Sequence, residues 1–328
     1  MKVHRPLNWL IVTLSLALVD AALAEPKVVV TSKPIHALVA GVMADVGSPR
    51  VLIEGAASPH TYAMRPSDAK AVAGADVFIR VSEALEPFTA KLVKSLPNKV
   101  RVVTMAEAPG IKLLDRREGG AFEAHEHDRT GRSHGKQQDA HGHAKKPARD
   151  HGKDDDGESD PHIWLDPDNA KAIVAQAVRV LSEASPAAAP RLRANGEALS
   201  ARIGALAAEI EREMRPLAGK PFIVFHDAFQ YFERYFGLSA AGSITVSPDV
   251  QPSARRLTEL RRKIQSLDAV CVFAEPSFEP KLVNTLTEGT RARSGTLDAE
   301  GAALPAGPDL YFTLMRGIAR SMQECLSD

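Results

Sequence analysis

Short runs of β-branched and apolar residues alternate with helical patterns along most of the chain. This alternation is typical of α/β layers built on parallel sheets, so we predict an α/β fold with two α/β lobes and mainly parallel sheets. The expected strands are 27–32, 51–53, 76–81, 100–105, 221–226, 239–246, 269–274 and 295–297. The expected helices are 35–46, one that begins at 65–68 with Ser67 as its N-cap, 87–96, 169–183, 186–214, 254–265, 278–289 and 310–325.

The helical pattern that follows Pro186 is the longest in the chain. Its apolar positions repeat at spacings of three, four and seven residues, at Leu192, Leu199, Ile203, Leu206, Ile210 and Met214. Such a helix spans roughly 40 Å at about 1.5 Å per residue, which is the width of a lobe. We expect a long rigid helix at 188–215 that links an N-terminal lobe at 25–187 to a C-terminal lobe at 216–328.

The first residues carry the pattern of an export signal. Lys2 and Arg5 precede an apolar stretch at 9–19, and Ala22-Leu23-Ala24 fits a small-residue cleavage site. The apolar stretch is too short to span a membrane, and no cysteine lies near the cleavage point to carry a lipid anchor. We expect residues 1–24 to be a signal peptide that is removed, which leaves an exported, soluble protein.

Residues 115–159 differ in character from the rest of the chain, because Phe122 is their only large apolar side chain. Such a segment buries too little apolar surface to offset its ordering entropy, so we expect a disordered insertion in the N-terminal lobe. It holds six of the eleven histidines, His125, His127, His134, His141, His143 and His151. These histidines are either weak metal sites or side chains of a solvated linker; histidines two residues apart lie on one side of an extended chain and could chelate together.

The charge balance excludes one class of partner. The 328 residues hold 41 Lys plus Arg and 41 Asp plus Glu, for a net charge of +0. The composition, 44% hydrophobic and 25% charged, is that of a globular protein. Without a basic excess, neither nucleic acid nor an anionic membrane surface is expected as the principal partner.

The chain has two cysteines, Cys271 and Cys325. An exported protein matures in an oxidising compartment, which favours a disulfide between them. The alternative is a pair of buried thiols that do not meet.

Three histidines outside the insertion stand where ligands gather in α/β folds. His60 follows the strand expected at 51–53, His226 ends the strand expected at 221–226, and His162 lies between two Asp-Pro steps. Ligands in open α/β sheets bind outside the carboxyl ends of the strands, and zinc is usually bound by imidazole, thiolate or carboxylate. The three histidines therefore either converge on one metal ion in the cleft between the lobes or are hydrogen-bonded loop residues.

The sequence segments around these histidines resemble those of a known protein family. The segments 55–68 (Gly-Ala-Ala-Ser-Pro-His-Thr-Tyr-Ala-Met-Arg-Pro-Ser-Asp), 160–166 (Asp-Pro-His-Ile-Trp-Leu-Asp), 225–232 (Phe-His-Asp-Ala-Phe-Gln-Tyr-Phe) and 273–278 (Phe-Ala-Glu-Pro-Ser-Phe) carry this resemblance. They closely resemble the periplasmic zinc-binding proteins of bacterial high-affinity zinc ABC transporters, in the metal-binding group of solute-binding proteins. The resemblance covers essentially the whole mature chain, in order.

This resemblance implies a periplasmic binding protein rather than an enzyme, with Zn2+ as the transported ligand. It implies a metal held between the lobes by His60, His162 and His226, and a disulfide between Cys271 and Cys325. It also implies a histidine- and acid-rich loop at 115–159, and for that loop we favour weak zinc binding over a solvated linker. The implied partners are an inner-membrane permease and its cytoplasmic ATPase, and we expect the binding protein to be a monomer.

Two departures from the family pattern leave the fourth ligand open. Some zinc members have a glutamate just before the first histidine, where this chain has Pro59. Family members commonly have Leu-Asp-Pro-Leu-Gly near the fourth ligand, where residues 297–301 read Leu-Asp-Ala-Glu-Gly. The fourth ligand is therefore Asp298, a water molecule, or a histidine of the insertion.

The third histidine favours zinc as the metal. Manganese and iron relatives resemble this chain but have a glutamate in place of His226, and manganese prefers oxygen ligands. Copper and nickel also accept imidazole, so a binding protein for manganese, nickel or copper is one alternative. A zinc-dependent adhesin is another.

A secreted zinc hydrolase is the least favoured alternative. Three histidines with an open fourth position also form a catalytic arrangement, but the chain has no His-Glu-x-x-His motif. Ligating imidazoles usually donate their second nitrogen to a carboxylate, for which Glu275, Asp166 and Asp227 are the candidates. The alternative roles are a helix cap for Asp166 and a solvent-exposed position for Asp227, and we expect Trp164 to pack in the core.

Overall fold

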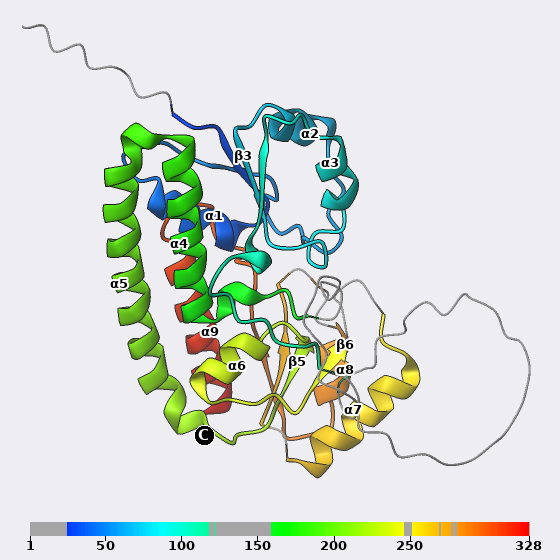
Figure 1. The fold of residues 1–328 in the computed structure, drawn as a ribbon. Coiled ribbons are helices and arrows are strands. Elements are labelled where there is room, and N and C mark those ends of the chain that lie inside the picture. The colour runs from blue at the N-terminus through cyan, green and yellow to red at the C-terminus, as the bar shows by residue number, and fades with distance from the viewer. Residues whose placement is uncertain are drawn as a thin grey trace, which may run out of the picture.

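The protein consists of two α/β lobes, each built on a parallel sheet (Figure 1). This computed structural model describes residues 25–117, 122, 159–245, 251–268, 270–276, 278 and 281–327. The sheets have matching strand orders, β2-β1-β3-β4 and β6-β5-β7-β8, and every pair of neighbouring strands is parallel. The predicted α/β architecture with two lobes is therefore confirmed.

The N-terminal sheet forms because its strands are short apolar runs that both faces of the sheet can bury. In register, Val29 of β1 pairs with Arg50 of β2 and with Phe78 of β3. The strands are β1 (Val28–Val30), β2 (Arg50–Val51), β3 (Val77–Arg80) and β4 (Arg101–Thr104). The helices between them are α1 (Lys33–Val42), α2 (Pro66–Ala73) and α3 (Thr89–Ser95).

The C-terminal sheet repeats this arrangement around β5, all of whose residues are buried. Ile223 of β5 pairs with Gly242 of β6 and with Val272 of β7. The strands are β5 (Phe222–His226), β6 (Gly242–Thr245), β7 (Cys271–Ala274) and β8 (Arg293–Thr296). The helices of this lobe are α6 (Gln230–Phe236), α7 (Ala254–Ser266), α8 (Lys281–Thr287) and α9 (Leu310–Leu326).

Two long helices connect the lobes along one side of the molecule (Figure 1). They are α4 (Pro167–Ala184) and α5 (Ala189–Met214), and α5 packs on α1 and α4 at one end and on α9 and α6 further along. The helical pattern predicted for 186–214 is thus observed, while the division of the chain at 187 and 215 remains a prediction. Single 3-10 turns lie at Met105–Glu107, Ile163–Leu165, Pro186–Ala188 and Arg215–Leu217. Among the described residues, every helix is too short or too polar to cross a membrane.

One apolar cluster extends through both lobes. It contains Val30 of β1, Leu206 of α5, Phe222 of β5 and Met315 of α9. Trp164 belongs to it and is fully buried, as predicted, and its indole nitrogen donates to the carbonyl of Ala299 at 2.9 Å. The lobes therefore share a hydrophobic core instead of meeting across a solvated gap.

Two local predictions were wrong. Helix α2 begins at Pro66 with Arg65 as its N-cap, not Ser67, because proline fits the first helical position; Asp68 accepts from the Arg65 amide at 3.1 Å. The second error is helix α6, which the sequence did not predict. It is short and rich in aromatic residues, which have modest helix propensity, so its helical signal is weak.

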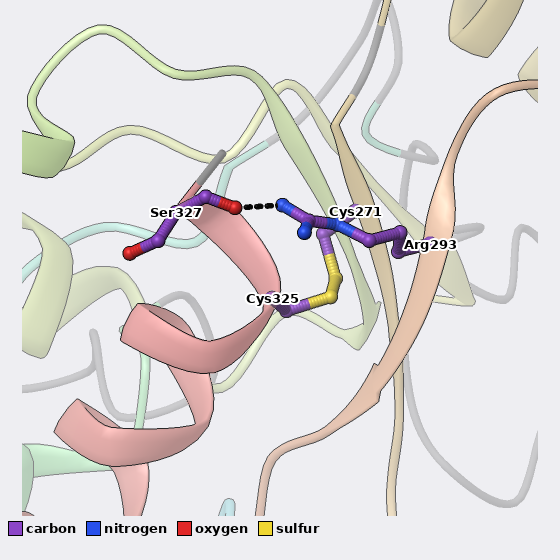
Figure 2. The surroundings of a disulfide bond; sticks show 4 residues. All are labelled: Cys271, Arg293, Cys325 and Ser327. Atoms are coloured by element: carbon purple, nitrogen blue, oxygen red, sulfur yellow. Dashed lines mark hydrogen bonds between the residues drawn. A yellow bond between two sulfur atoms is a disulfide. The ribbon is translucent and has the colours of Figure 1, made fainter.

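The cysteines form a disulfide that attaches the last helix to the C-terminal sheet (Figure 2). Cys325 near the end of α9 bonds to Cys271 of β7, with the Cα atoms 5.9 Å apart. Arg293 of β8 donates to the carbonyl of Ser327 just beyond the helix. The predicted pairing of Cys271 with Cys325 is confirmed.

The two ends of the histidine-rich insertion are held together and against the C-terminal lobe. Asp115 and Ser159 form an antiparallel bridge, and Tyr231 of α6 both accepts from the Leu114 amide at 3.1 Å and donates to the Asp160 carbonyl at 2.9 Å. The six histidines His125, His127, His134, His141, His143 and His151 lie outside the described residues, as do residues 1–24.

Arg117 adds a further polar contact to the two ends of the insertion, residues 115–117 and 159–160, which together we call the stem. Its guanidinium forms a forked ion pair with the carboxylate of Asp227, and it donates to Glu233 of α6 at 2.7 and 3.0 Å. The aromatic ring of Phe122 lies 4.2 Å from the guanidinium carbon. A residue at the start of the insertion is thereby bound to the opposite lobe.

Replacing both cysteines, Cys271→Ala with Cys325→Ala, should lower the free energy of unfolding by about 3–4.5 kcal/mol, because the bridge closes a long loop of the unfolded chain. Urea denaturation of oxidised wild-type and variant protein measures the loss. Wild-type protein unfolded in the presence of reductant should show the same loss, and an unchanged midpoint would contradict a stabilising role for the bridge.

Arg117→Met should cost about 3 kcal/mol of folding free energy, the low end of the range for breaking a buried ion pair, because it leaves two carboxylates without their cation. Arg316→Met is the matched control. Arg316 pairs with Glu209 through two bonds of 2.8 Å, but both side chains are largely exposed, so its loss should cost about 0–1 kcal/mol. Equal losses in urea denaturation would rule out a special contribution from the stem.

Candidate metal centre

The three predicted histidines come from three separate segments at the carboxyl ends of the sheets. His60 lies in the loop between β2 and α2, His162 directly precedes the 3-10 turn Ile163–Leu165, and His226 is the last residue of β5. His162 and His226 are 2% exposed, whereas His60 is half-buried. The structure thus brings two histidines of the N-terminal lobe and one of the C-terminal lobe to the same point.

The imidazole nitrogens of these histidines have the spacing of metal ligands. The Nε2 atom of His162 lies 3.4 Å from Nε2 of His60 and 3.3 Å from Nε2 of His226. All three can offer a ligand atom within 4.8 Å of the others. Zinc binds imidazole nitrogen at about 2.0–2.1 Å, so the edge of a zinc tetrahedron is about 3.3–3.4 Å. The two measured separations match that edge.

Carboxylates fix the orientation of two of the rings. Nδ1 of His162 is 2.7 Å from Oδ1 of Asp160, and Nδ1 of His226 bonds to Oε1 of Glu275. Because each Nδ1–H donates to a carboxylate, Nε2 is left to face the metal position. Glu275 is one of the predicted carboxylate partners, whereas Asp160 was missed.

The sequence contained a signal for Asp160. It stands two residues before His162 across a proline, and its Oδ1 also accepts from the His162 backbone amide at 3.0 Å. An aspartate that bonds to the backbone two residues ahead forms an Asx-turn, which holds the following side chain beside it. The Asp-Pro-His sequence is therefore a compact unit of ligand and supporting carboxylate.

Burial controls the protonation of the site. It lowers the pKa of His162 well below its ordinary value, with a further contribution from the charge of His226. Burial also raises the pKa of Asp160 to about 7. For His226, burial opposes the charged ring, but the Glu275 carboxylate outweighs it, and the pKa is raised. His162 is thus held neutral, the state in which an imidazole binds a metal.

Asp298, the predicted fourth ligand, does not join the three-histidine group among the described residues. Its Oδ1 accepts from the backbone amides of Glu300 at 3.1 Å and Gly301 at 2.8 Å. It does line a small cavity that His226 and Glu275 also line. The Asp298 carboxylate therefore lies next to the three-histidine group, and one of its oxygens accepts hydrogen bonds within a turn.

The two other predicted carboxylate partners have different roles. Asp166 caps helix α4 by accepting from the amides of Asp168 at 2.7 Å and Asn169 at 3.3 Å, which was its alternative role. Asp227 is neither a ring partner nor exposed to solvent, because its carboxylate pairs with Arg117. Neither supports a ligand ring directly.

Known structures share this fold. A crystal structure described as ZnuA has a TM-score of 0.71 at 21% sequence identity, over 92% of this chain and 100% of that one. A mutant of the laminin-binding adhesin Lmb from Streptococcus agalactiae has a TM-score of 0.71 at 24% identity, over 92% and 100% of the two chains. At these identities the likeness concerns the fold alone.

Sequence relatives are considerably more similar. The high-affinity zinc uptake system protein ZnuA of Brucella suis biovar 1 (strain 1330) is 46% identical over 305 residues, which cover 92% of this chain and 91% of that protein. The protein of the same name from Yersinia pestis is 35% identical over 306 residues, or 93% and 92% of the two chains. The family described as zinc-uptake complex component A, periplasmic, matches residues 28–325. This chain therefore belongs to the family of the periplasmic A components of zinc-uptake complexes.

Proposed function

We propose that the protein captures zinc in the periplasm and delivers it to the membrane permease of an ABC transporter, which a cytoplasmic ATPase drives. The cargo ligands are His60, His162 and His226. The single observation that best supports zinc is the separation of 3.4 and 3.3 Å between the Nε2 atoms, which fits a zinc tetrahedron. Family membership and the names of the relatives support the transport role.

Zinc is favoured over manganese because the converging donors are imidazole nitrogens, while manganese prefers oxygen. We assign the fourth coordination position to Asp298 or to a water molecule. Asp298 lines the cavity beside His226 and would have to give up its turn contacts to reach the ion. Capture and release require no bond to be made or broken in a substrate, so the protein acts as a binding protein and not as an enzyme.

The remaining features fit this role. We propose that residues 1–24 direct export and are removed, that 25–187 and 216–328 form the lobes on either side of a linking helix at 188–215, and that the mature protein works as a monomer. We also propose that the histidines of the insertion are weak zinc sites. The stem at Asp115 and Ser159 holds the ends of that insertion close to Asp160, which supports His162.

Zinc titration by calorimetry on the mature protein should give one tight site and a set of weaker ones. Replacing 118–158 with a short Gly-Ser linker keeps Arg117 and Ser159 and should remove only the weaker sites. His226→Ala in the mature protein should abolish the tight site, because it removes one of three imidazole ligands. Loss of the tight site with the insertion, or tighter binding of copper or nickel than of zinc, would overturn the assignment.

Asp160→Asn and Glu275→Gln should each weaken zinc binding about 10–100-fold, because an amide is a poorer acceptor for the ligand ring than a carboxylate. Asp166→Asn is the matched control. It changes a carboxylate four residues after His162 that caps α4, and asparagine is an equally good N-cap, so it should leave both stability and zinc affinity nearly unchanged. Chelator competition measures affinity, and equal effects in all three variants would contradict a specific role for Asp160 and Glu275.

A further inference from the structure

Lys33, the first residue of α1, is buried at the junction of the lobes with an exposed fraction of 5%. Its ammonium donates to the backbone carbonyls of Gly55 at 2.7 Å, Ala302 at 3.0 Å and Leu304 at 3.2 Å, and also to that of Gly301. Gly55 belongs to the N-terminal lobe and the other three to the C-terminal lobe. A single side chain thus binds backbone from both lobes.

An ammonium group in this position is costly to bury, so its contacts must compensate. It has three N–H donors and four carbonyl oxygens within reach, so its donors are fully used. Burial lowers the pKa of Lys33, and the nearby acidic groups of Asp298 and Glu300 offset only part of this shift. The side chain is therefore held by the backbone carbonyls around it.

The backbone is shaped to present these carbonyls. Gly55 and Gly301 have φ angles of +67° and +70°, in the left-handed region that residues with a side chain rarely adopt. A glycine therefore stands on each side of the ammonium, in one lobe and in the other. The contact depends on loop conformations that the sequence specifies on both sides.

The loop 298–304, which follows β8, is a point where both ligand segments of the N-terminal lobe attach to the other lobe. The carbonyl of Ala299 accepts from Trp164, two residues after His162. Lys33 connects the same loop to Gly55, which begins the segment that ends at His60. His162 is thus tied to the loop through an indole, and the His60 segment through an ammonium.

We propose that Lys33 is a positioning residue for zinc capture, which ties the His60 segment to the loop 298–304 so that His60 meets His162 and His226. The inference rests on the proposed function. His60 depends most on such a tie, because it is only half-buried while the other two histidines lie in the core. Without Lys33, the ammonium contacts that join the Gly55 carbonyl to the carbonyls of Gly301, Ala302 and Leu304 are lost, and with them this tie between the His60 segment and the loop 298–304.

The test is a double-mutant cycle between Lys33 and His60, measured on the mature protein with zinc alone. Lys33→Met keeps the length of the side chain and removes the donors. It should weaken zinc binding at least about tenfold, mainly through faster dissociation, as loss of a residue that orients a ligand does. In the His60→Ala background, where the positioned ligand is absent, adding Lys33→Met should change affinity less than about threefold.

Lys220→Met is the matched control. Lys220 donates to the carbonyl of Leu326 at 2.8 Å in the C-terminal lobe, where the carbonyl lies at the end of α9. It should leave zinc affinity within about twofold of the wild type, although it also removes a lysine–carbonyl bond. Thermal unfolding of each variant, without and with zinc, separates loss of folding from loss of binding.

Two results would overturn the proposal. One is Lys33→Met protein that binds zinc as tightly as the wild type. The other is a loss of the same size in the wild-type and His60→Ala backgrounds, which would place the effect in the fold at large. If Lys33→Met protein does not fold, the same cycle is measured with Lys33→Arg. The guanidinium keeps the positive charge, but it is bulkier than the ammonium and cannot donate to the four carbonyls in the same geometry. A wild-type protein that does not bind zinc would refute the proposed function instead.

Discussion

The rest of the structure depends on the burial of one apolar cluster by both lobes together. Independent domains usually move relative to each other unless their interface is large and hydrophobic. Here the sheets, α5 and α9 contribute to one core, and Trp164 crosses from one lobe to the other within it. Wide hinge opening would expose this core to water. The metal centre is therefore built at a seam that the hydrophobic effect keeps closed.

Binding a divalent ion at this seam has a free-energy cost, because the ion must leave water for a buried site. A divalent ion gains from leaving water only if the ligands are already aimed, because each buried polar group that must reorient costs free energy. Asp160 and Glu275 aim two of the rings, and both sit on segments that the core holds fixed. His60 is half-buried, which makes it the most solvent-accessible of the three ligands.

Periodicity in the sequence was enough to predict the two lobes and the long helix, because each depends on local pattern. The positions of His60, His162 and His226 near strand ends left two interpretations open, and it was the family resemblance that favoured their convergence. The contacts that support the centre were harder to predict. The role of Lys33 requires the positive φ angles of two distant glycines, and the turn that engages Asp298 forms only once the loop 298–304 has packed. Helix α6 lacked a strong local signal and is stabilised by its contacts, among them Glu233 with Arg117. Tertiary context, which a single sequence does not display, decided all three.

The bridge between Asp115 and Ser159 affects how the sequence of the insertion can change during evolution. The two ends of the insertion are adjacent and are anchored to the rest of the protein by Tyr231 and Arg117. Each doubling of the length of a closed loop adds only about 0.6 kcal/mol of entropy cost. Histidines can therefore be gained or lost between these ends by insertion and deletion, with little effect on folding or on the buried ligands. The number of histidines in the insertion can therefore evolve with zinc supply, independently of the buried metal ligands.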